Sequence, residues 1–187
     1  MSRWTCFVAL AAAALLSGCG SLLDRPAEEA PGNLLVNGSF ETWSDTGPPG
    51  WEIDQAGRNE RLGPEGAACH GNLAATIACL HPDDFVLLSQ TVAVKTPGLY
   101  RAQVFLRPLM PLQRCFLVLE TIDKAGQMRE AARREIRGQM GEWRPVSVTA
   151  VVPEGTMAVR FLLRIGPRAT GEAAFDAARL ELMSQAQ

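Results

Sequence analysis

The sequence predicts an all-β protein, built as a sandwich or jelly roll of antiparallel strands. The chain of 187 residues is 47% hydrophobic, which is enough to pack a core and leaves room for one domain of ordinary size. Apolar and polar residues alternate in short runs, and this period of two is typical of half-buried strands. Gly and Pro turn signals separate the runs every ~8–15 residues, a spacing that favours a β-sandwich.

Eight segments carry the strand pattern. Apolar and polar side chains alternate in residues 100–106, 145–152 and 157–165. Residues 85–94 and 115–122 are rich in apolar and β-branched side chains, which strands favour. In chain order, the expected strands are residues 34–40, 74–80, 85–94, 100–106, 115–122, 145–152, 157–165 and 173–182.

One further segment, residues 127–137 (QMREAARREIR), allows two interpretations. Its composition suits a short helix. Its charges also suit an edge strand, where they prevent pairing with a foreign sheet. The edge strand is the favoured interpretation.

The N-terminus has the features of an export signal. Arg3 precedes an unbroken apolar run over residues 6–16. This run is too short to span the ~30 Å of hydrocarbon that needs ~20 apolar residues, but it matches the apolar region of a secretory signal. We expect residues 1–18 to be the signal peptide, residues 19–32 a flexible linker, and residues 33–184 the folded domain.

The end of this run, Leu16-Ser17-Gly18-Cys19, resembles the lipobox of bacterial lipoproteins. The resemblance implies that Cys19 carries lipid and becomes the first residue of the mature chain. Two or more acyl chains anchor a protein stably, at ~0.8 kcal/mol per buried CH₂. In such lipoproteins, Asp after the cysteine is a signal for retention in the inner membrane. Gly20 stands at this position, which favours the outer membrane of the cell envelope as the location of the protein. A plain secretory signal with an incidental cysteine is the alternative.

Three cysteines remain in the expected domain: Cys69, Cys79 and Cys115. Export permits disulfides, but a strand between Cys69 and Cys79 would place them ~20 Å apart, beyond the reach of a bridge. Cys115 is the better partner for either, or all three thiols are free. His70 and His81 lie beside two of these cysteines, but their spacing matches no zinc motif, so zinc is not expected.

Five weak motifs occur in one order along the chain. They are residues 33–41 (NLLVNGSFE), 47–51 (GPPGW), 89–100 (SQTV…PGLY), 143–153 (W…VP) and 175–182 (FD…LEL). Together they resemble the galactose-binding-like β-sandwich of the carbohydrate-binding modules attached to cellulases and xylanases. The resemblance covers nearly all of the mature chain. It implies a jelly-roll β-sandwich of two antiparallel sheets and non-catalytic binding, most often to a polysaccharide.

The same resemblance implies a structural calcium ion where the first and last strands meet. Glu41 and Asp176 occupy the matching positions. Carboxylate oxygens are ligands that Ca²⁺ prefers. Hydrogen bonding at the strand ends is the alternative role of these two residues.

Arginines on the polar strand faces are candidate ligand-binding residues. Arg101, Gln103 and Arg107 share one face, and Arg160 and Arg164 share another. If both faces belong to one sheet, they form a cationic groove. Guanidinium groups bind carboxylate and phosphate in bidentate fashion, which predicts an anionic ligand such as a uronic-acid polymer, a lipid headgroup or an acidic protein. A solvated sheet face is the alternative.

Aromatic side chains that could stack on a sugar are few. Phe105 on a polar strand face and Trp43 in a loop are the two candidates. The family resemblance implies structural positions for Trp43, Trp51 and Trp143, and Tyr100 lies on the apolar face of its strand.

No sequence motif indicates catalysis, since the chain lacks a G-x-S-x-G elbow, a G-K-[ST] phosphate loop and an H-E-x-x-H motif. The net charge of −2 argues against nucleic-acid binding driven by overall positive charge. We therefore expect a lipid-anchored envelope module that binds carbohydrate and is not an enzyme. The alternative is an envelope lipoprotein with a structural or protein-interaction role and no sugar site.

Overall fold

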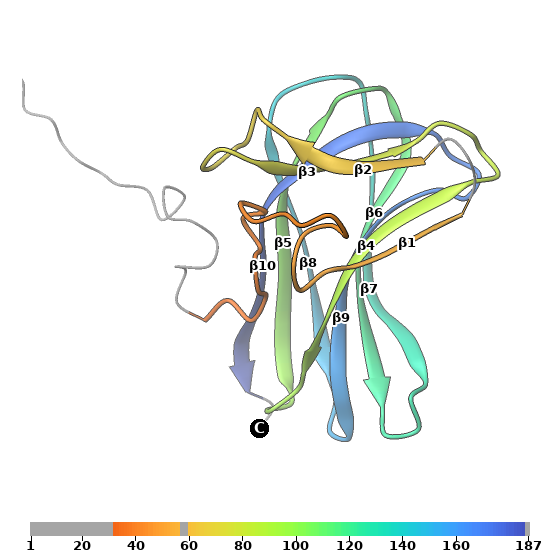
Figure 1. Cartoon of the computed structure of the whole chain (residues 1–187). Coiled ribbons are helices and arrows are strands. Elements are labelled where there is room, and N and C mark those ends of the chain that lie inside the picture. Colours follow the sequence, from red (N-terminus) through yellow and green to blue (C-terminus); the bar gives the residue numbers. More distant parts are fainter. Residues whose placement is uncertain (1–31, 57–59, 186–187) are drawn as a thin grey trace, which may run out of the picture.

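The computed structural model describes residues 32–56 and 60–185, and its elements are all strands. The expected signal peptide, linker and lipid site Cys19 lie outside the described residues. Two five-stranded antiparallel sheets pack face to face (Figure 1). This is the jelly-roll β-sandwich that the sequence predicts.

We name each sheet by its central strand. The β9 sheet consists, in spatial order, of β1 (Glu52–Ala56), β4 (Phe85–Ala93), β9 (Thr156–Ile165), β6 (Leu112–Asp123) and β7 (Met128–Gly138). The β10 sheet consists of β2 (Glu60–Glu65), β3 (Ala74–Cys79), β10 (Gly171–Gln185), β5 (Gly98–Pro108) and β8 (Arg144–Val152). The outer face of each sheet is the face directed away from the core.

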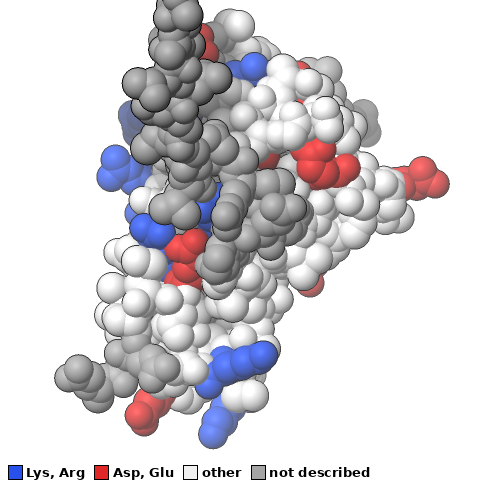
Figure 2. Space-filling view, turned by 90° about the vertical axis from the view of Figure 1, so that its left-hand side faces the viewer, with Lys and Arg blue, Asp and Glu red and all other residues white. Residues whose placement is uncertain are grey.

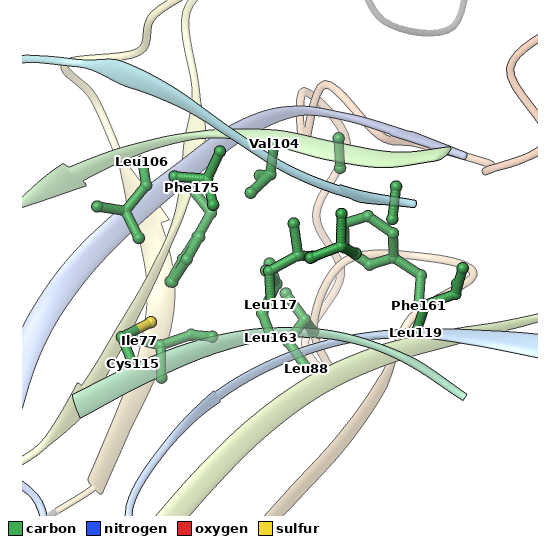
Figure 3. Packing of buried hydrophobic residues seen from close by; sticks show 14 of the residues in the cluster. Ile77, Leu88, Val104, Leu106, Cys115, Leu117, Leu119, Phe161, Leu163 and Phe175 are labelled. Carbon is green, nitrogen blue, oxygen red and sulfur yellow. The ribbon is translucent and has the colours of Figure 1, made fainter. Parts of the chain in front are cut away.

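The core lies between the two sheets, where alternate residues of each strand meet (Figure 3). Phe161 and Leu163 of β9 and Phe175 of β10 are fully buried. The alternation of burial in β5 and β8 follows the period of two in the sequence. If one of these strands slipped by one residue against its neighbour, its core side chains would turn to the outer face. The pattern of burial therefore also fixes the register of the strand.

Seven of the eight expected strands are confirmed, with each end no more than three residues from its expected position. The charged segment 127–137 is also a strand, β7. It pairs only with β6 and forms an edge of its sheet, so the helix interpretation is wrong.

The expected strand at residues 34–40 is wrong. Asn37 and Phe40 have positive φ values of 49° and 58°, which an extended strand does not allow. The segment is nevertheless anchored to the sandwich, since Gln90 Oε1 accepts a hydrogen bond from Val36 N at 2.7 Å and Gln90 Nε2 donates one to Val36 O at 2.9 Å. Its apolar pattern reflects burial of Leu35 and Phe40 and not strand pairing.

Two strands were not expected, β1 and β2. Both are short edge strands with few β-branched residues, and β2 contains Gly63 and Pro64. An edge position tolerates Pro because one side of the strand needs no ladder hydrogen bonds. Within the described part of the chain, no helix has the length and apolarity needed to cross a membrane.

Candidate functional site

Glu41 and Asp176 both bind the loop between β2 and β3 through backbone N–H groups. Glu41 Oε1 accepts hydrogen bonds from Asn72 N at 2.8 Å and Leu73 N at 3.0 Å. Asp176 Oδ2 accepts from Cys69 N at 2.8 Å and His70 N at 2.7 Å, and Asp176 Oδ1 accepts from Ala177 N at 2.6 Å. The two carboxylates therefore fasten this loop to the sandwich.

These surroundings do not fit a calcium ion. Each carboxylate faces N–H donors, which carry positive partial charge, where a cation site would offer oxygen ligands. Across residues 32–56 and 60–185, no three His, Cys, Asp or Glu side chains group as a metal site would require. The pKa of Asp176 is raised from 3.8 to about 6, because the effect of burial exceeds the opposing effect of the three backbone hydrogen bonds.

Among the described residues, Cys69, Cys79 and Cys115 form no disulfide, so the open question of their pairing is resolved in favour of three thiols. Burial, and to a smaller extent the charge of Asp176, raises the pKa of Cys69 to about 11. Burial also raises the pKa of Cys115 to about 12. At neutral pH both thiols are therefore mainly in the protonated form, which is a poor nucleophile.

Four candidate ligand-binding residues lie together on β5, on the outer face of the β10 sheet. Arg101 forms an ion pair with Glu181 at 2.7 Å. Arg107 lies 3.7 Å from Glu65, and its guanidinium lies 5.1 Å from the centre of the Trp143 ring. Phe105 is covered edge-on by His70, with ring centres 5.3 Å apart. These contacts, and the position of Gln103 between them, give β5 a largely neutralised outer face.

Arg160 and Arg164 lie on β9, in the other sheet. The condition for one cationic groove, that both sets share a sheet, is therefore not met, and the expected groove does not form. Arg160 forms a close ion pair with Glu120 on the adjacent β6, at 2.7 Å. Figure 2 shows one side of the molecule. Where the surface is not drawn in grey, acidic and basic side chains are interspersed on this side.

Arg164 belongs to a different arrangement, which we call the arginine pocket. The pocket has a volume of about 300 Å³ on the outer face of the β9 sheet. Its charged and aromatic lining consists of Arg114, Phe116, Arg133, Arg164 and Arg168. The strand register builds it, since Phe116 on β6 lies opposite Arg164 on β9, and its neighbour Val118 lies opposite Arg133 on β7.

Sequence reasoning missed four of these five residues. Arg114 and Phe116 lie two apart in one strand, so their shared face was readable from the sequence. Arg133 lies in the segment whose helix or strand state was open, and Arg168 lies in the β9–β10 turn. Only the pairing of the strands brings these residues together.

A second pocket, of about 260 Å³, lies between the loop after Trp43 and the edge strands β1 and β2. We call it the tryptophan pocket. The half-buried Trp43 lines it together with the exposed side chains of Asp45, Thr46 and Gln55. Trp43 Nε1 donates a hydrogen bond to Phe40 O at 2.7 Å, which fixes the indole in place.

Trp51 has a structural role. Trp51 is buried, donates a hydrogen bond from Nε1 to Asn37 O at 3.1 Å, and packs against Phe40 and Phe161.

A larger cleft of about 380 Å³ lies between β7 and β8 and is lined by Arg134, Arg144 and their neighbours. It follows the open edge of the sandwich and contains no aromatic ring.

No known family profile matches the chain, and no curated protein matches it. Solved structures do. The chain aligns over 79% of its length with a family 61 carbohydrate-binding module solved in complex with β-1,4-galactotriose, covering 97% of that module, at 20% identity and a TM-score of 0.57.

Two further structures show the same fold. The xylan-binding family 22 module of Paenibacillus barcinonensis Xyn10C aligns over 83% of this chain and 97% of that module, at 16% identity and a TM-score of 0.58. The enzymatically active domain of tailspike protein 4 from bacteriophage CBA120 aligns over 81% of this chain at 15% identity and a TM-score of 0.63, but the alignment covers only 21% of that domain's chain. The chain therefore has the β-sandwich fold of carbohydrate-binding modules.

Proposed function

We propose that the chain is a non-catalytic carbohydrate-binding module, attached to the bacterial cell envelope by lipid on Cys19. The observation that carries the carbohydrate proposal is the tryptophan pocket. A sugar ring presents apolar C–H groups and polar hydroxyls, and it binds where an aromatic face lies beside hydrogen-bonding side chains. Trp43 supplies the ring, Asp45 and Gln55 supply acceptors and donors, and Thr46 supplies a hydroxyl.

The architecture and the fold comparisons support this proposal. The pocket lies beside the edge strands β1 and β2, and Trp43 packs against the core, which fixes the position of its ring. An aromatic ring that is held rigidly loses little entropy when a ligand stacks on it.

The test measures binding of the full chain to a panel of neutral polysaccharides. Affinity electrophoresis and tryptophan fluorescence are the two measurements of binding. We expect Asp45→Ala and Gln55→Ala each to weaken binding by about tenfold, because each removes polar contacts to the sugar. Both side chains are exposed, so folding should be unaffected. Asp83→Ala, which removes an equally exposed acid elsewhere, is the matched control.

A chain that binds no neutral polysaccharide, with unchanged fluorescence across the panel, contradicts the proposal. That result would favour the protein-interaction alternative. Equal loss of binding in Asp83→Ala would show that the effect does not arise in the tryptophan pocket.

A further inference from the structure

The arginine pocket has chemistry that a neutral sugar does not use. Four arginines line one pocket in a chain whose net charge is −2. Like charges repel at this range, and burial strengthens the repulsion. A concentration of positive charge against the overall balance of the molecule therefore points to a specific partner.

Carboxylates within the protein neutralise only part of this charge. Arg114 lies 3.5 Å from Glu135, and Arg133 lies 3.6 Å from Glu130. Glu135 is shared with Arg137, which it contacts more closely, at 2.6 Å. Among the described residues, no carboxylate lies within ion-pair distance of Arg164 or Arg168. By contrast, Arg101 and Arg160, outside the pocket, each have a carboxylate at 2.7 Å.

Phe116 gathers the guanidinium groups. The centres of the Arg114, Arg133 and Arg164 guanidinium groups lie 5.2, 5.5 and 5.1 Å from the centre of its ring. The negative face of an aromatic ring attracts cations, which offsets part of their mutual repulsion. Phe116 is only 3% exposed and packs with Val118 and Leu162 in a small cluster on the outer face of the β9 sheet. The ring is thus a fixed base for the arginines and not a free stacking surface.

Donors in the pocket remain unused. The Nε atoms of Arg114 and Arg164 are buried and make no hydrogen bond within the described residues. A buried donor without an acceptor is costly, and an oxyanion would supply acceptors for several N–H groups at once.

The backbone places Arg168 at the rim. Gly166 has φ +82°, and a Cβ at this position would collide with Asp84 O in the β3–β4 turn. Because Gly166 has no side chain, the β9–β10 turn can approach the β3–β4 turn closely. Arg168 N then donates a hydrogen bond to Pro82 O across the two turns. The exposed Arg168 side chain extends the pocket toward solvent.

We propose that the arginine pocket is a second carbohydrate site, which binds the carboxylate groups of an acidic polysaccharide. That the ligand is a polysaccharide rests on the proposed function. That the ligand is negatively charged rests on the arginine pocket itself. A volume of about 300 Å³ is at the lower end for small-molecule pockets, so it suits one charged sugar unit of a longer polymer. The tryptophan pocket lies on other elements and is a separate site.

The test compares polygalacturonate with its fully methyl-esterified form, which has the same backbone without the charge. We expect the full chain to bind polygalacturonate at least about tenfold more tightly than the ester, with affinity falling as salt is raised. Arg164→Gln with Arg168→Gln should lower the affinity for polygalacturonate by about tenfold or more. Arg168→Gln alone, at an exposed position that does not affect folding, should give a smaller loss of the same kind.

The matched control is Arg134→Gln with Arg144→Gln, which removes the same charge from the cleft between β7 and β8. Binding within about twofold of the unmodified chain is expected for this control. Equal binding of polygalacturonate and its ester, or equal loss in both double variants, would overturn the inference and leave the proposed function intact. A chain that binds neither neutral nor acidic polysaccharides contradicts both.

Discussion

At the scale of single residues, Asp176 shows how a candidate metal ligand can have a structural role. Its side chain is fully buried, and its oxygens accept three backbone hydrogen bonds. The family resemblance implies calcium binding by Asp176 and Glu41, and hydrogen bonding at the strand ends is the alternative role. The structure supports the hydrogen-bonding role, because the donors around each carboxylate are N–H groups.

Asp176 also predicts how stability depends on pH. Its pKa of about 6 lies above the ordinary value of 3.8, so between these values the native state binds more protons than the unfolded state. The contribution of Asp176 to the free energy of unfolding therefore falls as pH rises from about 4 to about 6, and is constant above that range. We expect urea midpoints of the unmodified chain, measured against those of Asp176→Asn, to show this fall.

Asp176→Asn should be less stable at every pH. The asparagine side chain has an NH₂ group where Asp176 has an accepting oxygen, and this NH₂ group would face a backbone N–H donor. The stability difference between the two chains should shrink as pH rises toward 6. A difference that stays constant with pH would show that the native carboxyl titrates at its ordinary pKa.

At the scale of elements, the loop between β2 and β3 depends on one glycine. Gly71 has φ +73°, and a Cβ there would collide with Glu41 Oε1, the oxygen that binds Asn72 N and Leu73 N. The loop can approach the carboxylate this closely only because residue 71 has no side chain.

We predict that Gly71→Ala destabilises the protein more than Gly126→Ala, which has a similar φ of +77° and open space around it. Strain from positive φ alone costs about 1–2 kcal/mol, and crowding against Glu41 adds about 1–3 kcal/mol in Gly71→Ala. Urea midpoints of the two variants give the comparison. Equal midpoints would show that the loop moves away from Glu41 at no cost.

β7 illustrates the limit of local pattern at this scale. Its sequence suits a helix by composition, and only its pairing with β6 makes it a strand. Its charged residues then protect a sheet edge, and one of them, Arg133, becomes part of the arginine pocket.

At the scale of the whole molecule, the two pockets lie on different parts of one rigid sandwich. The tryptophan pocket lies beside β1 and β2, and the arginine pocket is formed by β6, β7 and β9. Two weak sites on one scaffold bind a polymer more tightly than either alone, provided that one chain can reach both.

The proposed lipid anchor determines where the whole molecule acts. We predict that Cys19→Ser, expressed in a host that processes lipoproteins, moves the chain from the membrane fraction to the soluble exported fraction, because stable attachment requires the acyl chains. Immunoblots of the fractions, with the mass of the mature N-terminus, provide the measurement. Membrane attachment that persists in Cys19→Ser would contradict lipid anchoring at this residue.

The sequence by itself determined the all-β class, most strand positions and the buried faces, because a period of two is a local property that survives any pairing of strands. It also supplied the proposed export signal and Cys19. Only the tertiary structure decided which strands became neighbours, and therefore that Arg164 joins Arg114, Arg133 and Arg168 while Arg101 and Arg107 lie on the opposite sheet. Residues far apart in the chain meet through strand register, which depends on packing across both sheets and is not written in any one segment.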